Sequence, residues 1–343
     1  MFVIKTNKII IYPVAFNLYT DKIDGNKKDG NTEQKEDSNT SILFFNETRL
    51  DENDVRKIQT DIKQFSEEKI LLIDFQNILI KDSRNFDILL PDREKHVIFA
   101  NLSIETGFFD KVATDIKIPI NLQDREERSI YSNEDICKQM KKSNIVSTLN
   151  QIYCDYIAEL INDCLDDGKD GFEFLESSCV FSSKYVNIRK IFRKPEQGRF
   201  LIYCLAYRVK ELVGDTGNYK LICTSKTGAI IANIISHMLN VPVVFCVGVG
   251  PKFAVKPDEI VERVQEQERY VYIFDFICIG TELKILSTFI SDRKSKLICG
   301  VGPASYIRCN HPEIAKRKLI LNKMHPLINV QDYPDMKYEI KIP

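Results

Sequence analysis

Short apolar runs alternate along the chain with longer segments whose apolar residues recur at helical spacing. In the carboxyl-terminal half, the runs at 219–223, 241–245 and 271–274 are rich in β-branched and aromatic residues, which is typical of buried strands. An apolar helical pattern follows the first run and ends near Asn240, and another begins at Leu283. This alternation predicts an α/β fold with a mostly parallel sheet and flanking helices.

The amino-terminal half shows the same alternation in shorter segments. Apolar runs at 69–75 and 97–100 predict buried strands, and Val55, Ile58 and Ile62 lie at the spacing of an amphipathic helix. Between the first apolar segment and this helix, residues 21–40 are a run of Lys, Asp, Asn, Glu, Gln and Ser, which predicts a solvated polar loop. We therefore expect a second, smaller α/β layer in this half.

A charged segment separates the two halves. The 343 residues exceed what one hydrophobic core usually covers, so we expect one domain at 1–122, a linker with a connecting helix at 123–149, and a second domain at 150–343. Residues 132–152 could also form a helix-turn-helix. They lack a clustered basic helix, so a connecting helix that leads into 153–165 is the simpler interpretation.

Composition narrows the class of protein. The formal net charge is −1 and the pI is near 6.5, so no global basic field indicates nucleic acid or an anionic membrane as a partner. The 10 cysteines form no Cys-x-x-Cys pair, which favours small buried hydrophobes in a reducing compartment. No signal peptide and no apolar run of membrane-spanning length is visible. We expect a cytoplasmic protein.

Two strand-to-helix turns carry groups suited to phosphate. Main-chain N–H groups, hydroxyls and the positive end of a helix together form an anion site. Asp275, at the end of its strand, is placed to accept hydrogen bonds from ribose hydroxyls or to hold Mg²⁺. The phosphate-binding candidates are Thr224, Ser225, Lys226, Thr227 and Gly228 in the first turn and Gly280 and Thr281 in the second.

With the segment 178–189 ahead of them, these turns resemble the type I phosphoribosyltransferases, and in particular the orotate phosphoribosyltransferase branch, over roughly residues 150–323. The resemblance implies that the first turn binds pyrophosphate and that the second, from Asp275 to Thr281, binds phosphoribosyl diphosphate with Mg²⁺. It also implies a homodimer. An opening pattern of that branch is carried by Ser178, Cys179, Ser182, Tyr185 and Asn187, of which Ser178, Ser182 and Tyr185 are expected on the side of the base.

Departures from the family pattern weaken the catalytic expectation. Phe276 stands where the family has a second acid, and the second turn is one residue short. In addition to Asp275, the catalytic candidates are Lys252 and Lys256, which would supply the cations of the catalytic loop. A departing pyrophosphate needs positioned cations and a metal. We expect nucleotide or phosphoribosyl diphosphate binding, with weakened transfer to or from a nucleobase. The alternative is a non-catalytic, nucleotide-sensing regulatory or assembly module, such as one in a bacterial stress or phage-defence system.

A second resemblance concerns the amino-terminal half. Asp74 at the end of a buried strand, followed by Asp82 and Ser83 at a helix start, resembles the STAS domains over about residues 42–121. The resemblance implies a protein partner for this half and makes Ser83 a candidate phosphorylation switch. Alternatively, Asp82 and Ser83 only cap a helix.

Overall fold

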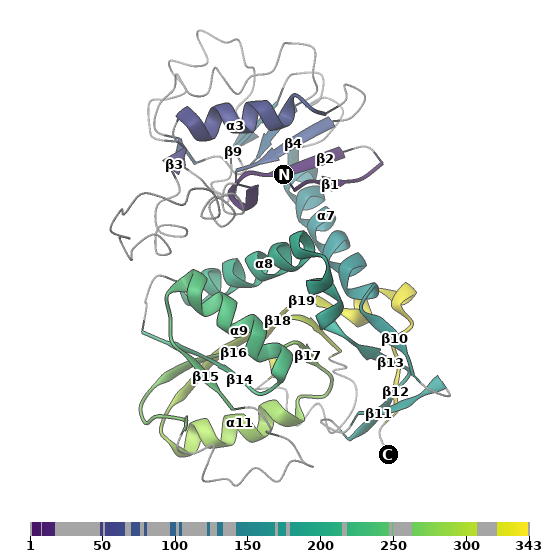
Figure 1. The fold of residues 1–343 in the computed structure, drawn as a ribbon, viewed down its shortest axis with the longest axis vertical. Helices are drawn as coiled ribbons and strands as arrows, with labels where there is room; N and C mark the ends of the chain where they lie inside the picture. The colour runs from purple at the N-terminus through teal and green to yellow at the C-terminus, as the bar shows by residue number, and fades with distance from the viewer. Residues whose placement is uncertain are drawn as a thin grey trace, which may run out of the picture. The chain divides into compact units, whose positions relative to one another are not determined.

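The structure is a computed structural model (Figure 1). It describes residues 2–7, 9–17, 49–50, 52–65, 70–75, 79–80, 97–100, 103–104, 122–123, 129–132, 142–168, 171–175, 179–214, 218–246, 249, 263–306 and 321–341. The chain divides into two compact units, Met1–Ile152 and Tyr153–Pro343.

The carboxyl-terminal unit is built on a parallel sheet, which confirms the predicted α/β class. Its strands are β14 (Lys220–Cys223), β15 (Val243–Phe245), β16 (Arg269–Ile273), β17 (Phe276–Ile277), β18 (Lys296–Ser305) and β19 (Met324–Asn329). They run in the order β15, β14, β16, β18 and β19. Because β19 takes the other edge of β18, the two residues of β17 pair with β18 on the edge that β16 uses.

Helices cover both faces of this sheet. Helices α8 (Pro195–Val213) and α9 (Lys226–Leu239) lie on one face, and α11 (Thr281–Asp292) lies on the other (Figure 1). Strand β15 lies on one side of β14 while β16 lies on the other, so right-handed crossovers place α9 and α11 on opposite faces. The chain therefore reverses its winding between β14 and β16. In open α/β sheets, ligands bind beyond the carboxyl ends of the strands at such a reversal.

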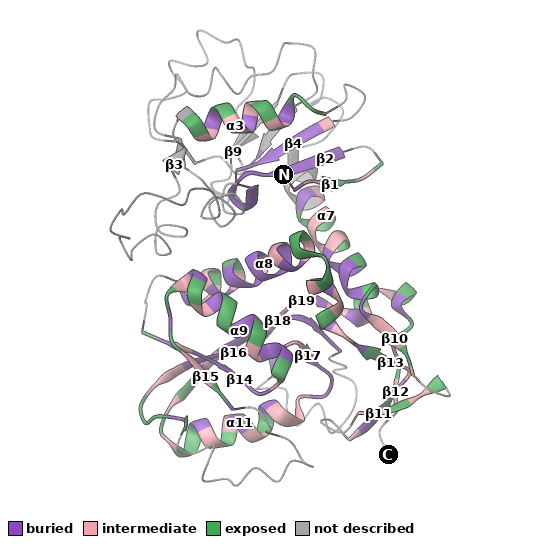
Figure 2. Ribbon diagram, in the orientation of Figure 1, coloured by how far each residue is buried: buried purple, intermediate pink, exposed green. Residues whose placement is uncertain are grey.

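Burial explains the apolar runs of the sequence. Leu221, Ile222 and Cys223 of β14 are fully buried, and the four residues of β16 from Tyr270 to Ile273 are nearly so. Strands with helices on both faces have no solvent side, so they read as continuous apolar runs rather than as alternating ones. Figure 2 shows these buried strands between helices whose outward residues are exposed.

Two small antiparallel sheets complete this unit. Strand β10 (Leu165–Asp167) pairs with β13 (Lys184–Val186), and β12 (Val180–Ser182) lies between β11 (Glu173–Leu175) and β20 (Ile340–Lys341). Short helices η2 (Ile188–Arg193), η3 (Val330–Asp332) and η4 (Pro334–Met336) connect the remaining segments. Pairing of β20 with β12 brings the segment around Tyr338 back to the residues that precede α8.

The amino-terminal unit has a mixed sheet. Its strands run in the order β1 (Ile4–Lys5), β2 (Ile9–Pro13), β4 (Ile70–Asp74), β6 (Val97–Ala100), β9 (Ser129–Ser132) and β8 (Leu122–Gln123), with β2, β4 and β6 parallel. A second sheet joins β3 (Arg49–Leu50), β5 (Leu79–Ile80) and β7 (Ser103–Ile104).

Helix α3 (Glu52–Ile62) is the predicted amphipathic helix of this unit. Val55, Ile58 and Ile62 are buried, as their helical spacing predicts. The Tyr12 hydroxyl donates a hydrogen bond of 2.6 Å to an Asp61 carboxylate oxygen, and this bond ties β2 to α3. The polar loop at 21–40 and Ser83 lie outside the described residues. The likeness to STAS domains stays a prediction.

The boundary between the halves differs from the expected one. Strand β9 lies inside the segment 123–149 that was expected to be a linker, yet it pairs with β6, with Phe99 opposite Tyr131. The pattern concealed this strand because only four residues pair and their flanks are charged. Helix α7 (Lys142–Asn162) then crosses the division at Ile152 as one continuous helix.

Candidate functional site

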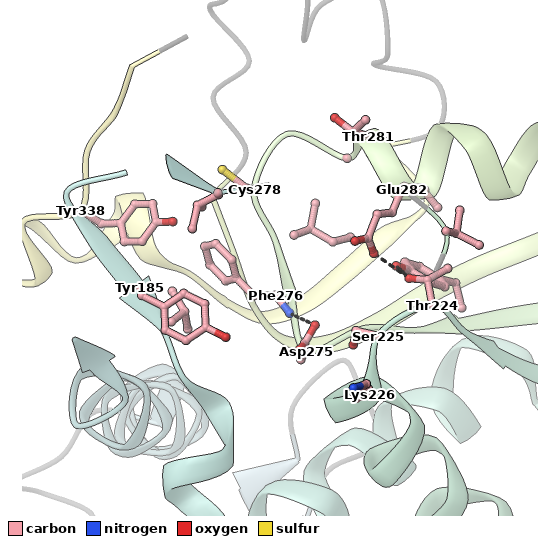
Figure 3. Close-up of a pocket in the computed structure, with 17 residues that line it drawn as sticks. Tyr185, Thr224, Ser225, Lys226, Asp275, Phe276, Cys278, Thr281, Glu282 and Tyr338 are labelled. Atoms are coloured by element: carbon pink, nitrogen blue, oxygen red, sulfur yellow. Dashed lines mark hydrogen bonds between the residues drawn. The ribbon is translucent and has the colours of Figure 1, made fainter. Parts of the chain in front are cut away.

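A cavity of about 360 Å³ lies at the carboxyl ends of β14 and β16, where the winding of the sheet reverses (Figure 3). Both predicted turns line it, together with residues of β13 and of the segment before β20. The predicted site residues among its lining are Tyr185, Thr224, Ser225, Lys226, Asp275, Gly280 and Thr281. The structure thus brings together residues that are up to 96 positions apart, from Tyr185 to Thr281.

The first turn is closed by a helix cap. Ser225 precedes α9 in an extended conformation, and its hydroxyl accepts a hydrogen bond of 2.9 Å from the Gly228 N–H. A Cβ atom at Gly228 would lie 3.1 Å from the Ile273 carbonyl oxygen, so glycine lets the first turn of α9 approach the end of β16. The N–H groups of Lys226 and Thr227 come too early in the helix to bond a helix carbonyl, which leaves them suited to an anion.

The second turn is built differently. Gly280 precedes α11 in the left-handed region, with φ 74°, and no side chain caps this helix. Ile277, Cys278 and Ile279 are buried, and the Ile277 carbonyl accepts a hydrogen bond of 2.7 Å from the Tyr306 N–H. Much of this turn therefore belongs to the hydrophobic core. Figure 3 places Thr281 at the side of the cavity away from Asp275 and Lys226.

Asp275 binds the end of β16 to the first turn. Its carboxylate accepts a hydrogen bond of 2.9 Å from the Phe276 N–H. Burial raises the pKa of this carboxyl, while hydrogen bonds from that N–H and from the hydroxyls of Ser225 and Thr227 oppose the rise. These partners hold the carboxylate against the start of α9.

Glu282 is a site residue that sequence reasoning missed. The Thr224 hydroxyl donates a hydrogen bond of 2.8 Å to a Glu282 carboxylate oxygen (Figure 3). The Tyr272 hydroxyl lies 2.8 Å from the same Thr224 oxygen. Burial raises the pKa of Glu282 to about 7, and the nearby Asp275 adds to the rise. An acid in the first turn of a predicted helix was the available signal, but it usually indicates only a helix start.

The opposite side of the cavity is aromatic. The rings of Tyr185, Phe276 and Tyr338 lie across the cavity from Glu282 and Thr224 (Figure 3). The ring centroids of Phe276 and Tyr338 are 5.5 Å apart, and those of Tyr306 and Tyr338 are 5.0 Å apart. An aromatic side and a polar side with helix N-termini suit a ligand that joins a planar ring to an anionic group.

The remaining predicted site residues fall into three groups. Thr227 and Gly228 lie in the first turn of α9, are buried, and do not line the cavity. Ser182 is fully buried in β12, where its hydroxyl donates to the Lys184 carbonyl over 2.7 Å, so it supports the main chain instead. Ser178, Lys252 and Lys256 lie outside the described residues.

The described lining does not fit a Mg²⁺ ion held by the protein alone. Among the residues that the structure describes, no group of three or more His, Cys, Asp or Glu side chains could hold a metal. The Phe276 side chain supplies no oxygen, and the Asp275 carboxylate already accepts the hydrogen bonds described above.

In the part of the chain that the structure describes, no helix is both long enough and apolar enough to cross a membrane.

Comparisons with known proteins give structural likenesses only. No protein-family model and no curated protein matches the sequence. Orotate phosphoribosyltransferase from Aeropyrum pernix is 14% identical, with a TM-score of 0.37, over 51% of this chain and 95% of that one. Adenine phosphoribosyltransferase from Thermoanaerobacter pseudethanolicus is 15% identical, with a TM-score of 0.37, over 50% and 99%. UMP synthase from Leishmania donovani is 11% identical, with a TM-score of 0.39, over 83% and 55%.

These solved structures are type I phosphoribosyltransferases or contain one, and the first two cover about half of this chain. With identities from 11% to 15% and TM-scores from 0.37 to 0.39, the likenesses do not by themselves define an activity. Substrate and chemistry have to be inferred from the cavity.

Proposed function

We propose that the carboxyl-terminal unit binds a nucleotide or a related phosphoribosyl compound in this cavity, and that phosphoribosyl transfer to or from a nucleobase is weak. The observation that carries the proposal is the position of the cavity between the N-terminal ends of α9 and α11, at the point where the winding of the parallel sheet reverses. Such a position offers the N–H groups at the start of α9 to an anion.

The aromatic side supports a base as the other end of the ligand. Tyr185 is 39% exposed and lines the cavity together with Phe276 and Tyr338. Stacking of a base on an aromatic ring contributes roughly 1–3 kcal/mol. A phosphate at the start of α9 and a base near Tyr185 together describe a nucleotide.

Weak transfer follows from the second turn. Phe276 occupies the position at which an additional carboxylate would hold ribose hydroxyls, and it pairs with Ala304 of β18 as part of a strand. The neighbouring Asp275 is held to the first turn and has a raised pKa. The described residues therefore give little support to a ribose or to charge on a leaving pyrophosphate. Mg²⁺ and a homodimer stay predictions, and no observation on the described amino-terminal residues favours the regulatory alternative.

The test is calorimetric titration of the full chain with ribose 5-phosphate, nucleoside monophosphates and phosphoribosyl diphosphate in Mg²⁺ buffer. Pyrophosphate release is measured alongside with a panel of nucleobases. We expect a nucleotide or phosphoribosyl compound to bind and release to be slow or undetectable. If none of these compounds binds, the proposal is wrong, and rapid release would contradict weak transfer.

Phe276→Asp tests the cause of the weakness. A carboxylate beside Asp275 should strengthen binding of phosphoribosyl diphosphate in Mg²⁺ buffer, because it adds an acceptor for ribose hydroxyls or a ligand for the ion. Phe276→Leu is the matched control, since it also removes the ring contact with Tyr338 but adds no charge. Equal affinities for the two variants would show that Phe276 does not disable the site.

A further inference from the structure

We propose that Glu282 determines which anions the cavity accepts. Its carboxylate occupies the Thr224 end of the first turn, so that the cavity accepts a single phosphate and rejects two linked phosphates. The inference rests on the proposed function, because it concerns the anion site of that cavity. Its ligand class is a phosphate monoester, as in a nucleoside monophosphate, and its excluded class is a diphosphate or inorganic pyrophosphate.

The first step concerns the proton of Thr224. A hydroxyl has one hydrogen to donate, and Thr224 donates it to Glu282 over 2.8 Å. The Tyr272 hydroxyl, 2.8 Å from the same oxygen, must then be the donor to Thr224. Burial keeps Tyr272 protonated, since it raises the pKa of that phenol well above its usual value. When Glu282 is ionised, the three groups form a directed relay that ends on its carboxylate.

The second step concerns competition for this relay. An anion that reaches Thr224 must take the hydrogen that Glu282 accepts, and it must approach the carboxylate as a like charge. The N–H group and the ammonium group of Lys226, which lies at the start of α9 and lines the cavity, stay available. A phosphate at Lys226 leaves the relay intact, whereas a second phosphate linked to it extends the negative charge toward Glu282.

The third step concerns the charges around Glu282. Asp275, at the end of β16, faces it and disfavours its ionised form. Lys226, at the start of α9, is the one cationic side chain among the described residues that line the cavity. Helix α11 contributes its positive N-terminal end. Protonation of Glu282 removes the repulsion, so binding of a diphosphate should become coupled to proton uptake.

The test uses inorganic phosphate and inorganic pyrophosphate as probes on the full chain, by calorimetry at pH 6 and at pH 8.5. At pH 8.5, Glu282→Gln should raise the affinity for pyrophosphate about tenfold, the factor for one charge-assisted hydrogen bond, and leave phosphate within about twofold. The wild-type protein should approach the variant at pH 6. Because both proteins meet the same pyrophosphate, titration of the probe itself cancels in the comparison.

Asp292→Asn is the matched control, since Asp292 is exposed at the other end of α11 and its loss should change neither affinity. Glu282→Ala is the second variant if the glutamine form does not fold. Unchanged pyrophosphate affinity in the Glu282 variants, or an equal gain for phosphate, overturns the inference and leaves the proposed function standing. If no form binds phosphate, pyrophosphate or a nucleotide, both fail.

Discussion

The two turns that meet in the cavity begin at neighbouring parallel strands and lead into helices, but they differ in the polarity of their residues. The turn after β14 is polar, with a side-chain cap from Ser225 to Gly228. The turn after β16 enters its helix through Gly280 without a side-chain cap, and its middle residues are buried apolar ones. The first turn carries polar groups of the kind that bind an anion, whereas the middle of the second turn is part of the hydrophobic core.

This difference separates binding from catalysis. A phosphate needs N–H groups and a cation, which the first turn supplies through α9 and Lys226. Transfer also needs a held ribose and a stabilised leaving group, which depend on the second turn. A chain with one intact turn and one apolar turn should therefore bind ligands of this class better than it converts them.

The largest effect should come from Gly228→Val. The new Cβ would lie 2.9 Å from the Ser225 hydroxyl oxygen and 3.1 Å from the Ile273 carbonyl oxygen, so the start of α9 must move. We expect the free energy of unfolding to fall by about 3 kcal/mol, measured by urea denaturation, with loss of phosphate binding. Ala229→Val, one position along the same helix, controls for the helix propensity of valine. Equal losses in both variants would show that the first turn is not tightly packed.

The next effect is a dependence of stability on pH that arises from Glu282, at the start of the helix that follows the second turn. Burial raises the pKa of Glu282 from 4.5 to about 7 in the folded protein, so its contribution to stability is full below pH 4.5 and is lost as the pH rises through 7. Glu282→Gln removes this titration. At pH 8 the variant should be more stable than the wild-type protein by about 3 kcal/mol, and the difference should vanish near pH 4.5. Urea denaturation across this range is the measurement, and a constant difference would contradict the raised pKa.

Lys226→Ala tests the first turn as an anion site. The ammonium group is exposed, so its removal should hardly change the free energy of unfolding. Affinity for a phosphorylated ligand should fall on the order of tenfold, which corresponds to about 1.4 kcal/mol. Lys284→Ala, exposed on the helix of the second turn, is the control and should leave affinity unchanged. Intact affinity with a lowered melting temperature would make Lys226 a structural residue instead.

The smallest effect should come from Gly280→Ala in the second turn. Alanine at φ 74° is strained by roughly 1 kcal/mol, and we expect the free energy of unfolding to fall by about that much without a change in phosphate affinity. Gly214→Ala has a similar φ of 68° with no neighbour within 4 Å of its Cβ, so it measures the backbone strain alone. A loss of phosphate affinity in Gly280→Ala would show that the second turn also binds the anion.

Much of the carboxyl-terminal unit could be predicted from local pattern. Strands β14 and β16 are apolar on both faces, so their runs are visible in the sequence, and Thr224 to Gly228 stand out as a polar turn between a strand and a helix. Glu282 could not be found in this way. Its partner Thr224 lies 58 positions away, and only the packing of α9 and α11 at neighbouring strand ends joins them.

The strand β17 and the strand β9 escaped prediction for a related reason. Strand β17 has two residues and β9 has four, which is too few for a periodic pattern in the sequence. Each forms a strand only because a neighbouring strand, β18 for β17 and β6 for β9, presents an edge to it.

By itself, the sequence determined the α/β class and the position of two strand-to-helix turns, because apolar periodicity and turn chemistry act over a few residues. Only the tertiary structure decided that these turns share one cavity, that Asp275 is held to Ser225 and that Glu282 takes the hydrogen of Thr224. The physical reason is that hydrogen bonds and burial depend on distances between elements, and sheet order sets those distances.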